Sequence, residues 1–217
     1  MPSYEGFEIK DVVHRGARST VLRAVRRADD QPVVLKHPTT DVPSASTLRR
    51  LRYELDVGAR LGARSGLPYL GEHRFGTSAA IVMEDLGAVD LERRYGGARM
   101  PLREWLVLAR KIALALADLH ALGFVHGDVK PANVLTTVYD RVVLCDFGNS
   151  LTLGASRRFA SLGGTLAYIP PEQTGRTDRD LDHRADLYSL GATLFQLLVG
   201  RLPFDYDDPL ALLHAHL

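Results

Sequence analysis

The sequence predicts an α+β protein with two lobes, a small antiparallel β-sheet lobe that carries one helix and a mainly helical large lobe. Short β-rich runs alternate with turn residues over residues 7 to 36, a pattern typical of an antiparallel meander. Two long helical patterns, at residues 101–122 and 184–199, dominate the second half. We place the boundary so that the N-terminal lobe comprises residues 1–86 and the C-terminal lobe residues 87–217.

The N-terminal lobe changes from strands to a helix and back to strands. Its first strands are expected in "FEIKDVV", "STVLRAVR" and "PVVLK", with Gly16 in the first turn. The stretch "PSASTLRRLRYELDVGARL" then places Leu48, Leu51 and Leu55 on one apolar helix face, and Glu54 borders that face. The segment "HRFGTSAAIVMEDLG" returns to strand chemistry.

The C-terminal lobe begins with a stretch from Gly87 to Met100 that we expect to be a loop, because it is rich in Gly and Arg. Pro101 then opens a helical pattern that reaches Leu122. The run "VVLCDFG" predicts a short strand that ends in a turn, and residues 149 to 181 predict a long loop. The last strong pattern, "RADLYSLGATLFQLLVG", is apolar nearly all round and predicts a buried helix that ends at a glycine.

Composition excludes several classes of protein. The 217 residues are 46% hydrophobic and 24% charged, as in an ordinary globular protein, and the net charge of +1 gives no electrostatic case for nucleic acid or for an anionic membrane. The single cysteine cannot form an intrachain disulfide, which fits a reducing compartment. The N-terminus is too polar for a signal peptide, and no apolar run reaches the roughly 18 residues that a membrane span needs. We therefore expect a cytoplasmic protein.

The stretch "HGDVKPANVL" at residues 126–135 is the first candidate site. It places Asp128, Lys130 and Asn133 on a short non-helical segment, where their side chains could converge on a phosphate and its metal ion. By itself, the same stretch is equally compatible with an ordinary polar turn.

Four motifs in order decide between these two interpretations. They are "HGDVKPANVL", "DFG" at 146–148, "GGTLAYIPPE" at 163–172 and "DLYSLG" at 186–191, and together they resemble the eukaryotic-type serine/threonine protein kinases over nearly all of the chain from Phe7 onward. The segments "PPEQTGR" and "LDHRADLYSLGATLFQLLVGRLPF" are most similar to the kinase domains of large bacterial hybrid signalling proteins, in which a kinase precedes an ATPase module and often a sensor histidine kinase. The resemblance implies a bilobal protein-kinase-like fold, and it implies further domains of a longer chain.

The resemblance also implies roles for the polar residues of the large lobe. Asp128 matches the catalytic aspartate that accepts or orients the proton of the substrate hydroxyl, and Lys130 would steady the γ-phosphate. Thr165 matches the threonine that bonds to both of them in serine/threonine kinases, which favours a Ser or Thr acceptor on a protein substrate. Asn133 and Asp146 would hold Mg²⁺ through hard oxygen ligands.

The ATP site implied by the resemblance is centred on Lys36, which would contact the α- and β-phosphates, and on its helical partner Glu54. Of the three glycines in the family's phosphate-covering loop, "HRGARSTV" retains only Gly16, so the cover should be looser or reshaped. The remaining ATP-binding residues expected from the resemblance are Val21, Val34, Met83, Glu84, Leu86 and Leu135, with Glu84 to Leu86 as the hinge whose backbone meets adenine.

Two other functions stay open at this point. "HGD" in place of the usual HRD also resembles small-molecule phosphotransferases of the aminoglycoside and choline kinase type, although these generally lack the "GT…PPE" segment and "DLYSLG". A pseudokinase, which binds nucleotide or serves as a scaffold without turnover, is the alternative outside the enzyme class. The substituted glycine loop favours a pseudokinase, whereas the presence of the catalytic and metal-binding residues argues against it.

Two expectations concern regulation and the C-terminus. Gly127 replaces an arginine that in many kinases binds a phosphate on the activation loop, so phosphates at Thr152, Ser156 or Ser161 should gain little from the catalytic loop. Compared with the family, the large lobe lacks its last helices, and we expect Leu210, Leu213 and Leu217 to form an uncovered apolar stripe. The chain would then be a fragment of a longer kinase or a truncated gene product.

Overall fold

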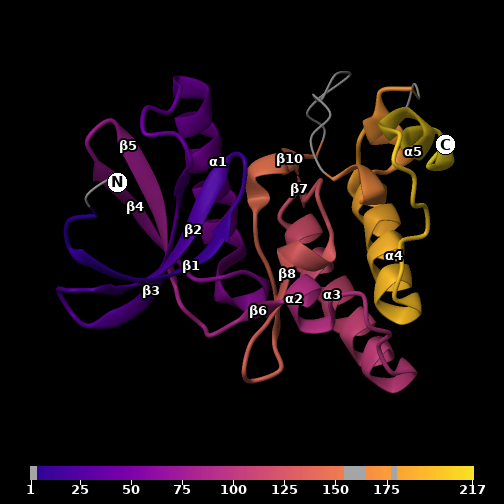
Figure 1. The fold of residues 1–217 in the computed structure, drawn as a ribbon, viewed down its shortest axis with the longest axis horizontal. Helices are drawn as coiled ribbons and strands as arrows, with labels where there is room; N and C mark the ends of the chain where they lie inside the picture. The colour runs from indigo at the N-terminus through magenta and orange to yellow at the C-terminus, as the bar shows by residue number, and fades with distance from the viewer. Residues whose placement is uncertain (1–3, 154–164, 177–179) are drawn as a thin grey trace. The chain divides into compact units, whose positions relative to one another are not determined.

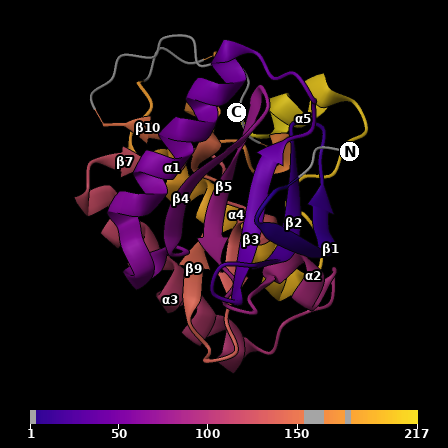
Figure 2. The ribbon, with the colours of Figure 1, turned by 90° about the vertical axis from the view of Figure 1, so that its left-hand side faces the viewer.

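The computed structural model describes residues 4–153, 165–176 and 180–217. It divides into two compact units, which we describe separately. The first unit contains residues 1–63 and 67–87, and the second contains residues 64–66 and 88–217. Figure 1 gives the elements of both units, and Figure 2 shows the first unit facing the viewer.

The first unit is a five-stranded antiparallel sheet with one long helix. The strands are β1 (Phe7–Arg15), β2 (Ser19–Arg26), β3 (Gln31–Pro38), β4 (Tyr69–Phe75) and β5 (Ser78–Glu84), in the spatial order β1-β2-β3-β5-β4. The predicted meander of three strands is confirmed, because β1 pairs with β2 and β2 with β3 in antiparallel register. Helix α1 (Ala45–Ser65) confirms the helical pattern, and its buried residues include Leu51 and Glu54.

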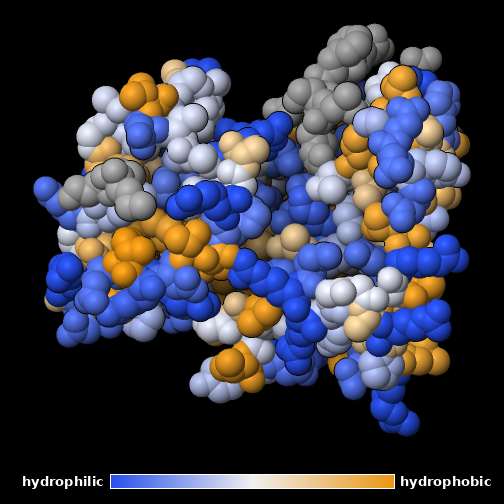
Figure 3. All heavy atoms as spheres, viewed as in Figure 1, coloured by the Kyte–Doolittle hydropathy of each residue, from blue (hydrophilic) through white to orange (hydrophobic). Residues whose placement is uncertain are grey.

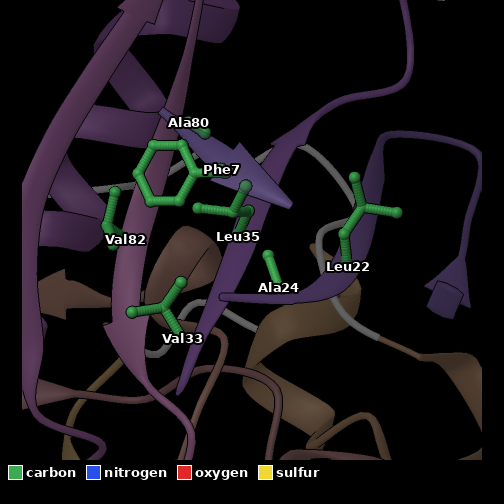
Figure 4. Close-up of a cluster of buried hydrophobic side chains, with 7 residues drawn as sticks. All are labelled: Phe7, Leu22, Ala24, Val33, Leu35, Ala80 and Val82. Carbon is green, nitrogen blue, oxygen red and sulfur yellow. The ribbon is translucent and has the colours of Figure 1, made fainter. Parts of the chain in front are cut away.

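The residues of this sheet divide between its two faces according to strand register. One face carries an apolar cluster that Figure 4 shows, formed by Phe7, Leu22, Ala24, Val33, Leu35, Ala80 and Val82. Successive residues of a strand point to opposite faces. Val34 and Lys36 therefore lie on the other face, and Ile81 and Met83, which pair with them across β5, lie there too.

The second unit is mainly helical. Its helices are α2 (Leu91–Tyr95), α3 (Leu102–Ala121), α4 (His183–Val199) and α5 (Pro209–Ala215), and its short strands are β6 (Val89–Asp90), β7 (Phe124–Val125), β8 (Val134–Thr136), β9 (Val142–Leu144) and β10 (Leu151–Thr152). Helices α3 and α4 confirm the two long helical patterns, and α4 ends at Gly200 in the left-handed conformation as predicted. No helix among the described residues combines the length and the apolar character that crossing a bilayer would require.

The expectation that Gly87 to Met100 forms a loop is wrong. Strand β6 and helix α2 occupy part of it. Asp90 caps α2, since its Oδ1 accepts a hydrogen bond from the Arg93 N–H at 2.8 Å, and Leu91 is fully buried. Gly96 ends the helix in the left-handed conformation. Five residues are too few to show the helical repeat of apolar residues in the sequence. The helix is stabilised instead by the Asp90 cap and by the burial of Leu91.

The end of α4 is bonded to the segment that leads into α3. The Met100 N–H donates to the Leu197 carbonyl at 2.8 Å, and the Arg99 Nε donates to the Val199 carbonyl at 3.0 Å. The Trp105 indole N–H donates to the Leu194 carbonyl at 2.8 Å. Carbonyls of the last turns of α4 thus receive donors from residues nearly one hundred positions earlier in the chain.

The prediction of an uncovered apolar stripe near the C-terminus is wrong for Leu213 and holds for Leu210 and Leu217. Leu213 is only 6% exposed, because α5 packs against the short turn at Leu166–Tyr168, whereas Leu210 and Leu217 are exposed as expected. On α4, Leu187 and Phe195 are also exposed. Figure 3 shows hydrophobic residues at the surface in this part of the second unit.

Candidate active site

The segment "HGDVKPANVL" follows β7 and runs into β8, and it is held by a carboxylate from α4. Asp186, which is 1% exposed, accepts hydrogen bonds from the backbone N–H groups of His126 at 2.8 Å and of Gly127 at 2.9 Å. The buried helix α4 thus anchors the loop through this carboxylate. The His120 Nε2 lies 2.8 Å from the Asp186 Oδ2, so α3 contributes to the same anchor.

The anchored loop presents Asp128 inside a group of polar side chains. Asp128 is 7% exposed, and its Oδ2 accepts a hydrogen bond from the Lys130 Nζ at 2.9 Å. Its Oδ1 accepts bonds from the backbone N–H of Thr165 at 3.0 Å and from the Thr165 hydroxyl at 3.2 Å. The Lys130 Nζ also donates to the Thr165 Oγ1 at 2.5 Å. An aspartate, a lysine and a threonine hydroxyl thus form a closed triangle, in which a carboxylate is held ready to accept a proton and an ammonium group lies beside it.

Asn133 lies next to this triangle, and Asp146 follows a residue that is bonded to Asn133. The Asn133 side-chain N–H₂ donates to the backbone carbonyl of Asp128 at 2.8 Å, which leaves the amide oxygen as the atom that could bind a cation. The Cys145 N–H donates to the Asn133 carbonyl at 3.1 Å, so Asp146 follows directly after a residue that is bonded to Asn133. A carboxylate and an amide oxygen are ligands that suit a hard divalent cation, so the donor set fits such an ion.

The first unit contains a buried ion pair. The Lys36 Nζ on β3 donates to both carboxylate oxygens of Glu54 on α1, at 2.6 Å and 2.8 Å, and both side chains are nearly inaccessible to solvent. Strand register places Val21, which pairs with Lys36, and Met83, which pairs with Val34, on the same sheet face as the lysine. Lys36, Val21, Val34 and Met83 are therefore collected on one surface of the sheet.

The remaining residues expected to bind ATP lie in a turn, at the end of a strand, in a connection and in a short strand. Gly16 is in the β1–β2 turn, where its N–H donates to the Ser19 carbonyl at 2.9 Å and its own carbonyl accepts from the Thr39 hydroxyl at 2.9 Å. Glu84 ends β5, and its N–H donates to the Pro68 carbonyl at 2.9 Å. Leu86 follows in the same connection, and Leu135 lies in β8 of the second unit; both are half-buried.

Two residues near the site belong to the packing of the second unit. His126 is fully buried, its Nε2 lies 3.1 Å from the Cys145 carbonyl, and its ring centroid lies 5.3 Å from that of Phe147. His126 is therefore part of the packing of this unit. Cys145, which directly follows β9, is half-buried.

Sequence reasoning missed two polar residues that contact the loop. The Asn149 Nδ2 donates to the Asp128 Oδ2 at 3.4 Å, and the Gln173 Nε2 donates to the Gly127 carbonyl at 3.2 Å. Asn149 directly follows "DFG" and Gln173 directly follows "PPE", so adjacency to these motifs was the available signal. Of the expected phosphate positions, Thr152 ends β10, whereas Ser156 and Ser161 lie outside the described residues.

Comparison with known proteins agrees with this geometry. The family model "Protein kinase domain" matches residues 7–216. The chain belongs to the protein kinase domain family. It is 34% identical over 97% of its length to the serine/threonine-protein kinase PksC of Streptomyces coelicolor, and 33% identical over 93% of its length to the serine/threonine-protein kinase PknL of Mycobacterium tuberculosis. It is also 30% identical over 91% of its length to the serine/threonine-protein kinase fused of Drosophila melanogaster.

Membership of this family establishes the fold class as a β-sheet lobe and a helical lobe, and it implies the use of ATP with a divalent metal ion. The chain spans 40% of the length of PksC, 51% of PknL and 24% of fused. None of these three relatives carries a name that indicates a hybrid signalling protein, so that resemblance stays a prediction.

Proposed function

We propose that this domain transfers the γ-phosphate of ATP to Ser or Thr hydroxyls of protein substrates in bacterial signalling. The observation that carries the proposal is the closed triangle of Asp128, Lys130 and Thr165. The family membership supports the same reaction, since the three relatives named above are all serine/threonine-protein kinases.

Each residue has a task that follows from its contacts. The Asp128 carboxylate would accept or orient the proton of the substrate hydroxyl, and its bonds to Thr165 and Lys130 hold it in one orientation. Lys130 would offset negative charge on the transferred phosphoryl group. Lys36, kept in place by Glu54, would hold the α- and β-phosphates through its ammonium group.

We assign the divalent ion as Mg²⁺, held by the amide oxygen of Asn133 and the carboxylate of Asp146. When bound, this ion neutralises charge on the phosphates of the nucleotide. The hydrogen bond from Asn133 to the Asp128 carbonyl fixes which amide atom is presented to the ion, and so couples the ligand to the catalytic loop.

The two alternative functions have less support. A small-molecule phosphotransferase generally lacks the segment that contributes Thr165, whereas here Thr165 bonds to both Asp128 and Lys130. A pseudokinase would lack one of the charged groups that transfer requires, whereas Lys36, Glu54 and Asp128 are all present, as are Asn133 and Asp146. The proposal includes further domains of a longer protein and a cytoplasmic location, where ATP is available as the donor.

The test is phosphate transfer from labelled ATP with Mg²⁺ to a generic protein acceptor, with an aminoglycoside and choline offered in parallel. Asp128→Asn should lower the rate by about 10² to 10⁴ while leaving ATP binding nearly intact. Asp205→Asn, on the exposed surface, is the matched control. Analysis of the phosphorylated amino acids should give phosphoserine or phosphothreonine. Transfer by Asp128→Asn at the parental rate, or transfer only to a small molecule, would contradict the proposal.

A further inference from the structure

An ion pair ties strand β2 to the connection that follows β5. The Arg23 Nε donates a hydrogen bond to the Asp85 Oδ2 at 2.6 Å, although the two residues are 62 positions apart in the chain. Both belong to the first unit. The Asp85 side chain is 10% exposed and that of Arg23 is 39% exposed. Hydrogen bonds between charged groups are stronger than those between neutral groups, so this contact can hold the connection against the sheet.

Arg23 lies on the same sheet face as Lys36. Its neighbours along the strand, Leu22 and Ala24, both belong to the apolar cluster of the opposite face. Across the sheet, Arg23 pairs with Val34, which also shares the face of Lys36. The guanidinium therefore extends to the connection from the face that carries the residues expected to bind ATP.

Asp85 also shapes the chain around Leu86. The Asp85 Oδ1 accepts a hydrogen bond from the Gly87 N–H at 2.9 Å, which closes a turn with Leu86 between acceptor and donor. Gly87 has φ of +60°, a left-handed conformation that favours glycine. The Asp85 N–H donates to the Pro32 carbonyl at 3.2 Å. The two carboxylate oxygens of Asp85 thus have separate partners, one on β2 and one in the turn.

One backbone donor of this connection is left over. The N–H groups of Glu84, Asp85 and Gly87 all donate to acceptors within the first unit. In the described part of the chain, the Leu86 N–H has no acceptor. This donor follows a strand that carries an apolar residue, Met83, on the face of Lys36. Such a donor beside apolar side chains suits a flat heteroaromatic ring with an acceptor nitrogen, which adenine provides.

We propose that Arg23 and Asp85 are positioning residues for nucleotide binding. Arg23 holds the Asp85 carboxylate, the carboxylate holds the Gly87 N–H, and the turn so fixed directs the Leu86 N–H toward the adenine ring. The inference rests on the proposed function, because it takes ATP as the ligand. Both residues act through the backbone of the connection and not through the phosphates.

The experiment compares the parent with Arg23→Gln, Asp85→Ala and the double variant. If Arg23 acts through Asp85, its replacement has no further effect once the carboxylate is absent. Arg26→Gln is the matched control, because Arg26 lies on the opposite face of the same strand and forms an ion pair with Asp29 at the same distance of 2.6 Å. Both arginines are partly exposed, so loss of either ion pair should cost little stability, and a thermal scan checks that each variant is folded.

Two ligands are titrated into each protein by isothermal titration calorimetry. Adenosine carries the base without phosphates, and ATP with Mg²⁺ carries both. If the positive charge of Arg23 served only to attract phosphates, its loss would weaken ATP binding and leave adenosine binding unchanged. A misdirected Leu86 N–H weakens both ligands by the same factor. The KM for ATP and kcat are measured in the phosphate-transfer assay.

Arg23→Gln should weaken the binding of adenosine and of ATP by about tenfold, raise the KM for ATP by a similar factor and leave kcat within about twofold of the parent. Asp85→Ala should weaken binding at least as much, because the turn also loses its acceptor. The double variant should match Asp85→Ala, and Arg26→Gln should match the parent.

The inference is overturned if Arg23→Gln weakens ATP alone, if it changes the affinity for neither ligand, or if the double variant binds adenosine more weakly than Asp85→Ala does. A parent that binds adenosine and transfers no phosphate contradicts the proposed function, and the adenosine titrations still decide the role of the pair. A parent that binds no adenosine overturns the inference itself.

Discussion

Asp186 offers a direct test of how the catalytic loop is held. Its Oδ2 receives the His126 N–H and faces the His120 Nε2, and its Oδ1 receives the Gly127 N–H. Asp186→Asn replaces one of these oxygens with an N–H₂ group, which would then face another donor in a site that is 1% exposed. A hydrogen bond to a charged group is worth about 1.5 to 3 kcal/mol, and a buried donor left without an acceptor costs a similar amount, so we expect a loss of about 3 kcal/mol.

For a chain of this size, 1 kcal/mol lowers the melting temperature by about 2 to 4 °C, so the variant should melt about 6 to 12 °C below the parent. Calorimetry or a dye-based thermal scan measures this difference, with Asp205→Asn at the exposed surface as the control. Phosphate transfer, assayed well below the new melting temperature, should also fall because the loop loses its anchor. A variant that melts within a degree or two of the parent would refute the reasoning.

Three further predictions concern the metal ion, regulation and pH. Asp146→Ala should remove the Mg²⁺-dependent stabilisation by ATP in a thermal-shift assay, and an unchanged shift would argue against its role as a ligand. Because Gly127 has no side chain that could bind a phosphate, a phosphatase-treated sample should keep its activity, and loss of most of the activity would contradict this. Burial lowers the pKa of His37 and of His216, so below about pH 6.5 the unfolded chain takes up protons before the folded chain does. The melting temperature should therefore fall as the pH is lowered from about 7.5 to about 5.5, and His216→Gln should weaken this pH dependence. A melting temperature of the parent that does not change over this range would contradict the prediction.

Local patterns were sufficient for most of the elements. Alternation of apolar residues located β1 to β3, and helical periodicity located α1, α3 and α4, because each of these elements is long enough to repeat its period. The triangle around Asp128 was implied by the resemblance to serine/threonine kinases, and its three members do lie within hydrogen-bonding distance of one another.

The features that were not predicted depend on tertiary contacts or on a single residue. Helix α2 is one turn long and depends on the Asp90 cap. Strand β4 contains a β-bulge, since Tyr69 pairs with Met83 and Gly71 with Val82, which leaves Leu70 as an extra residue. The bulge cannot be read from the sequence, because it depends on the register between β4 and β5. Leu213 is buried because a turn distant in the sequence covers it. Such contacts produce no periodic pattern of apolar residues, so they could not be predicted from the sequence.

The bonds at the end of α4 have a consequence for synthesis on the ribosome. Arg99 and Trp105 precede their acceptor residues by 100 and 89 positions. At about 5 to 20 residues per second, the segment before α3 emerges about 5 to 20 s before the end of α4 does. Until then its donors can bond only to water or to a chaperone. Trp105 is the single tryptophan of the chain, so its indole fluorescence on stalled nascent chains of increasing length would report the moment when the helical unit closes.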